Sequence, residues 1–133
     1  MNAIKAVLIL LSAVLVARAQ LAVTVAAPKV TGRKAVVSLA MKNGLADQVE
    51  SARAVCFLLD EQGKMLGQAT RWVIGGTEDN PGLAAGATNA FHFVITSDKP
   101  FTTTNLTTKV QFSRIVLEGG KLADPQRDVQ IAQ

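Results

Sequence analysis

The side chains able to carry catalysis are few. The chain contains one histidine, His92, and one cysteine, Cys56. A hydrolytic triad needs a nucleophile, a base that titrates near neutral pH and an acid that orients the base. His92 lies between two phenylalanines on an expected strand, and no serine or acid is tied to it by a recognisable motif. We therefore expect no catalytic residue and a protein that is not an enzyme.

Metal and cofactor chemistry has little support in the sequence. Zinc generally takes three or four Cys, His or carboxylate ligands, and the soft ligands here number two. Glu78, Asp79 and Asn80 stand together in a glycine-rich loop over 75–88, and such oxygens suit calcium. Three adjacent oxygens do not complete the shell of six to eight that calcium prefers. We predict no metal and no cofactor.

Trp72 directly precedes this loop and has two interpretations. An exposed tryptophan is a platform on which sugar rings stack, whereas a buried one anchors the core between two sheets. The core position is favoured. A glycan- or calcium-binding module built from Trp72, Glu78, Asp79 and Asn80 is the alternative function.

Cys56 lies in the run Ala54-Val55-Cys56-Phe57-Leu58-Leu59. One cysteine allows no intramolecular disulfide, so folding must rest on the hydrophobic core. A bridge to another chain is the alternative, but a small buried apolar side chain is the reading favoured by this run.

The N-terminal residues have the pattern of a secretory signal peptide. Residues 1–5 carry one positive charge, residues 6–16 are apolar apart from Ser12, and Ala17-Arg18-Ala19 has the small-x-small cleavage pattern. A membrane anchor would need about 20 apolar residues. We expect cleavage after Ala19, a periplasmic or extracellular protein, and no stable membrane insertion afterwards.

Removal of residues 1–19 leaves a domain over residues 20–133 with 12 basic and 10 acidic residues, a net charge of +2. The cations are spread along the chain among acids, whereas nucleic-acid binders concentrate them on one face. We predict no nucleic-acid partner.

The rest of the chain has the sequence pattern of an all-β protein. Short segments rich in Val, Ile, Leu, Phe and Thr are separated about every ten residues by Gly, Asn, Asp and Pro. The expected strands are 21–26, 34–42, 49–59, 64–74, 89–96, 109–117 and 127–131, with 101–108 an extended crossing segment. About seven antiparallel strands predict an immunoglobulin-like two-sheet β-sandwich, with a single closed sheet as the alternative.

Two local features are expected within these strands. Asn43-Gly44 offers a turn, or the start of a longer loop to Gln48. In 109–117 the apolar phase jumps between Phe112 and Ile115, which predicts a β-bulge near Ser113 or Arg114.

Residues 34–96 resemble the FxLYD-type immunoglobulin-like domains of exported bacterial proteins. The likeness rests on Cys56-Phe57-Leu58-Leu59-Asp60, on Gly63-Lys64-Met65-Leu66-Gly67, and on the stretch from Leu83 to Phe91. Leu58 and Asp60 keep the family positions, while Cys56, Leu59 and Ala85 replace its Phe, Tyr and Pro. The resemblance implies a sandwich fold with Cys56 and Leu58 inward, and no catalytic residue.

The strand over 49–59 is apolar on both faces. If Ala54, Cys56 and Leu58 point inward, then Val55, Phe57 and Leu59 line up outside, where exposed apolar surface signals a partner. The alternative is that the segment 21–27 or the loop 75–88 packs over these three side chains. We predict a protein partner or self-association through Val55, Phe57 and Leu59.

Overall fold

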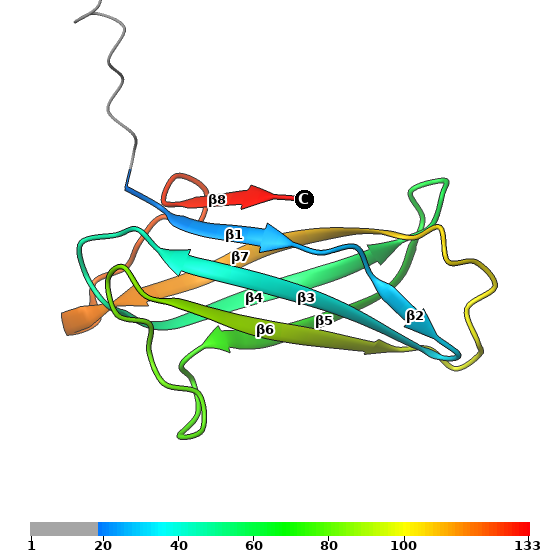
Figure 1. Ribbon diagram of the computed structural model, residues 1–133, viewed down its shortest axis with the longest axis horizontal. Helices are drawn as coiled ribbons and strands as arrows, with labels where there is room; N and C mark the ends of the chain where they lie inside the picture. The colour runs from blue at the N-terminus through cyan, green and yellow to red at the C-terminus, as the bar shows by residue number, and fades with distance from the viewer. Residues whose placement is uncertain (1–18) are drawn as a thin grey trace, which may run out of the picture.

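The computed structural model describes residues 19–133, so the predicted signal peptide lies outside the described residues except for Ala19. The described chain is an all-β sandwich of two sheets (Figure 1). Its strands are β1 (Leu21–Val25), β2 (Lys29–Thr31), β3 (Lys34–Asn43), β4 (Val49–Leu59), β5 (Met65–Ile74), β6 (Thr88–Thr96), β7 (Thr107–Leu117) and β8 (Val129–Ala132). Among residues 19–133, the only helical element is the 3-10 turn Glu118–Gly120, and no helix there is long and apolar enough to cross a membrane.

The first sheet is built around β3. The strand β6 pairs with β3 along one edge, and β1 and β2 share the other edge, all antiparallel to it. The strand β8 adds to β1 as a parallel neighbour. The second sheet has the order β5-β4-β7 and is antiparallel throughout. Two separate sheets exclude the single closed sheet and confirm the sandwich.

The core lies between the sheets and follows the alternation of the strands. In β3 every second residue is buried, because successive side chains of a strand point to opposite faces. The largest fully buried apolar side chains are Phe93, Leu21, Leu39, Met41, Leu58, Ile74, Ile115, Val23, Val37, Val49 and Val73. These residues come from both sheets, so one contiguous core can hold the fold without a disulfide.

The expected bulge in β7 is present. Phe112 pairs with Ala54 and Arg114 with Arg53, so Ser113 is the extra residue between two consecutive positions of β4. The bulge restores Ile115 to the buried face after Phe112, as the jump in the apolar phase predicts.

One strand was not expected. β2 forms a hairpin with the start of β3, with Thr31 opposite Lys34 and a two-residue turn at Gly32 and Arg33. Gly32 has φ 60°, which suits the first position of such a turn. The segment 101–106 is irregular, and Thr107 and Thr108 belong to β7 instead.

Asn43 organises the end of the sandwich where the long loop returns. The sequence favours a turn here, but Asn43 is the last residue of β3 and its side chain is fully buried. Its Nδ2 donates to the carbonyl oxygens of Asp47 and Leu83, at 2.9 and 3.0 Å, and its Oδ1 accepts from the Leu45 amide at 2.9 Å. The side chain therefore connects the loop that follows β3 to the loop that contains Leu83. The connection after β3 is the longer loop, and Asn43 stabilises it from within.

Candidate functional site

The candidate site is the outer face of the three-stranded sheet, centred on β4. Ala54, Cys56 and Leu58 are fully buried between the sheets, as expected. Val55 and Phe57, which alternate with them, are half-buried on the opposite face, and so is Leu59. The sequence therefore predicted correctly which set of residues faces the core.

Neighbours within the same sheet account for this half-burial. Phe57 lies opposite Gln68 on β5 and Lys109 on β7. Val55 lies opposite Thr70 and Gln111. Long polar side chains beside a central strand cover the flanks of its apolar residues and leave their tips in water.

The two segments that were candidates to cover this face lie elsewhere. The residues 21–25 form β1, which pairs with β3 and β8 in the other sheet. The loop 75–87 packs against the beginning of β4, where Leu83 bridges Val49. Neither contact reaches Phe57.

The apolar surface is longer than the sequence indicated. Met65, the first residue of β5, pairs with Leu59 and is 52% exposed. We call Val55, Phe57, Leu59 and Met65 the apolar stripe. Sequence reasoning missed Met65 because it follows a turn, and only the register of β5 against β4 places it beside Leu59.

Trp72 is not a core residue, which corrects the favoured interpretation. It is half-buried and pairs with Arg53, whose side chain is exposed on the outer face of β4. A Cβ on Gly76 would lie 2.4 Å from Trp72 Cγ, so the loop backbone packs directly on this side chain. A register shift next to Arg53 sets this position, and the alternation of β5 alone did not reveal it.

Cations border the apolar stripe. Arg53 pairs with Arg114 across β4 and β7, and Lys109 pairs with Phe57. All three cations are exposed. Two ion pairs occur among residues 19–133, and neither involves these three side chains. The face is apolar along β4, with positive charge beside it on β7 and at the Arg53 end of the stripe.

The acidic part of the long loop does not converge. Glu78 and Asp79 are exposed, and the Asn80 side chain donates to the Trp72 carbonyl oxygen at 3.4 Å. Within residues 19–133, no group of three His, Cys, Asp or Glu side chains is placed to hold a metal ion.

His92 lies on the outer face of the other sheet and is exposed. Its Nδ1 is 2.7 Å from Ser38 Oγ on β3, a pairing that the sequence did not suggest because it arises from the β3–β6 register. The hydrogen bonds of the described residues give His92 no carboxylate partner, so the pair lacks the orienting acid of a triad.

Burial raises the pKa of the Cys56 thiol from 9.0 to about 11. The unfolded chain therefore loses this proton at lower pH than the folded chain, and folding stability should fall as the pH rises from about 9 towards 11. Below pH 9 both states keep the proton and the contribution is constant. We expect the folding stability of Cys56→Ala, measured by urea unfolding, to fall less steeply over this pH range than that of the wild type. An unchanged slope between pH 9 and 11 would show that the thiol is not shielded.

A scan of protein-family models finds no match to this chain, and a search of curated proteins finds none.

Proposed function

We propose that this protein is an exported, non-enzymatic β-sandwich domain that binds another protein, in the cell envelope or outside the cell. The supporting observation is the apolar stripe, which runs along the outer face of a central strand and continues onto exposed Met65. Apolar side chains aligned on an open sheet face are typical of interaction surfaces. The export rests on the N-terminal sequence pattern.

The charge around the stripe defines the partner further. Lys109 and Arg114 on β7 border one side of it, and Arg53 on β4 borders its end next to Val55. A partner surface with an apolar centre and carboxylates at its rim would complement both features, and charged rims mainly set orientation and the rate of association. A second copy of the chain presents the same cations to itself, so a different acidic protein is the better fit.

A Met65→Ser variant tests the stripe at its most exposed position. We expect the immobilised wild-type domain, residues 20–133, to retain an envelope or secreted protein of its own source, and Met65→Ser to retain much less. The control is Val94→Ser on β6, because Val94 is 47% exposed on the outer face of the other sheet. Equal retention by all three proteins would contradict the proposal.

Glycan or calcium binding by Trp72 and the loop 75–88 is the competing function. It predicts a calcium- or sugar-dependent rise in melting temperature that disappears in Trp72→Ala or Asp79→Ala. The stripe predicts no such change, so a thermal melt with each ligand separates the two functions.

A further inference from the structure

The side of the sandwich between β7 and β8 is open. In immunoglobulin-like sandwiches the last strand pairs in the same sheet as the strand before it. Here β8 pairs with β1 in the other sheet, and β4 is the only strand that pairs with β7 (Figure 1), apart from a bridge between Val116 and Leu122 at the end of β7. Strand β7 is therefore a free edge of its sheet, and it lies beside β8, which is a free edge of the other sheet.

The edge of β7 presents unpaired backbone groups over a defined length. The Thr108 carbonyl oxygen points outward, because it accepts a 2.9 Å hydrogen bond from Gln133 Nε2. Backbone groups alternate along a strand, so Val110 and Phe112 present their N–H and C=O on the same side. At the other end, the Ala123 amide donates to the Ile115 carbonyl oxygen at 3.0 Å. Between these two contacts, residues 109–114 span about 20 Å of strand.

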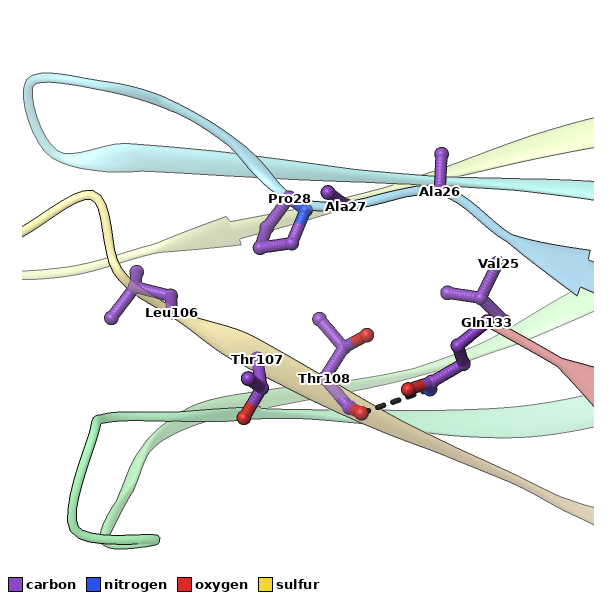
Figure 2. Close-up of a pocket in the computed structure, with 8 residues that line it drawn as sticks. All are labelled: Val25, Ala26, Ala27, Pro28, Leu106, Thr107, Thr108 and Gln133. Carbon is purple, nitrogen blue, oxygen red and sulfur yellow. Dashed lines mark hydrogen bonds between the residues drawn. The ribbon is translucent and has the colours of Figure 1, made fainter.

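A groove with both apolar and polar lining flanks this edge. It measures about 410 Å³ and lies between Val110 and Phe112 of β7 and Val129 and Ile131 of β8, with Gln111 and Gln126 also lining it. A smaller hollow of about 190 Å³ continues beyond the Gln133 contact, between β7 and the segment that follows β1. Figure 2 shows the Gln133 side chain reaching β7 at this point. The two hollows lie one after the other along β7, and the hydrogen bond from Gln133 to Thr108 separates them.

We propose that this edge binds an extended peptide segment of another protein as an added strand, with apolar side chains at alternate positions. Its backbone would pair with Val110 and Phe112, and its alternate side chains would enter the groove against Val129 and Ile131. The groove has β7 on one side and β8 on the other, so a single extended segment fits it, whereas a second copy would bring its own β8 alongside its β7. The added strand would displace Gln133 from Thr108.

Selection of phage-displayed random peptides of about ten residues on the full domain tests this proposal. We expect selected peptides with apolar residues at alternate positions, and slowed hydrogen exchange of the Val110 and Phe112 amides when the peptide binds. Ile131→Lys should weaken binding at least about tenfold, because it places a charge in the groove. The adjacent Gln130→Lys, on the outer face of the sheet, should leave binding within about twofold.

Gln133→Ala should strengthen peptide binding, because the Thr108 carbonyl becomes free. Phe57→Ser should leave it unchanged, which separates this edge from the apolar stripe. The proposal would be overturned if no peptide is selected, if selected peptides leave the β7 amides exchanging freely, or if those amides are protected by dimerisation alone.

Discussion

Phe57→Ser is expected to bind the protein partner at least about thirtyfold more weakly, a loss of about 2 kcal/mol. Phe57 is the largest member of the apolar stripe and lies at its middle, between Val55 and Leu59. Aromatic residues at the centre of an interface carry much of its binding energy, because they are fully dehydrated when the partner docks. The effect should appear in titrations with the purified partner.

The same substitution should leave unfolding cooperative and lower the free energy of unfolding by about 1 kcal/mol. Phe57 is half-buried by neighbours in its own sheet and lies outside the core. Substitution of a core phenylalanine by alanine costs about 3–5 kcal/mol, so a loss of that size on urea unfolding would place Phe57 in the core. Val94→Ser is the matched control and should change neither affinity nor stability appreciably.

Gly75→Ala is expected to destabilise the domain by about 3 kcal/mol or more. Gly75 has φ 64°, and a Cβ built on it lies 2.0 Å from the backbone oxygen of Glu50. The alanine would have to adopt a left-handed conformation and also push the start of β4 away. Differential scanning calorimetry measures the loss as a lower melting temperature.

Gly86→Ala separates the two contributions. Gly86 also has positive φ, at 80°, but a Cβ there meets nothing within 4 Å. It should cost only about 1–2 kcal/mol, from backbone strain alone. Equal losses for the two variants would mean that the loop yields at Gly75 and that its contact with Glu50 does not hold the loop in place.

The strands could be predicted where one face is buried and the pattern alternates. β4 has the expected bounds, and the phase jump in 109–117 located the bulge at Ser113. β2 was missed because a segment of three residues, Lys29–Thr31, is too short to show a period. Strand pairing was also beyond the sequence, since the choice of β8 between β1 and β7 depends on long-range contacts.

The candidate site was also predicted only in part, because alternation within a strand could be read from the sequence and the pairing between strands could not. Apolar residues on both faces of 49–59 revealed Val55, Phe57 and Leu59, because a sandwich strand has one inner face. Met65 joins them, and Trp72 leaves the core, only through the register of β5 against β4. The resemblance to FxLYD-type domains and the signal peptide stay predictions.

Photo-crosslinking from the stripe is the most direct test of the proposed function. Benzoylphenylalanine would replace Phe57 in one variant and Val94 in another, each expressed in the source cells with the full chain. We predict a discrete crosslinked protein from position 57 and none from position 94. The same products from both positions, or none from position 57 while the variant remains folded and exported, would contradict binding through this face.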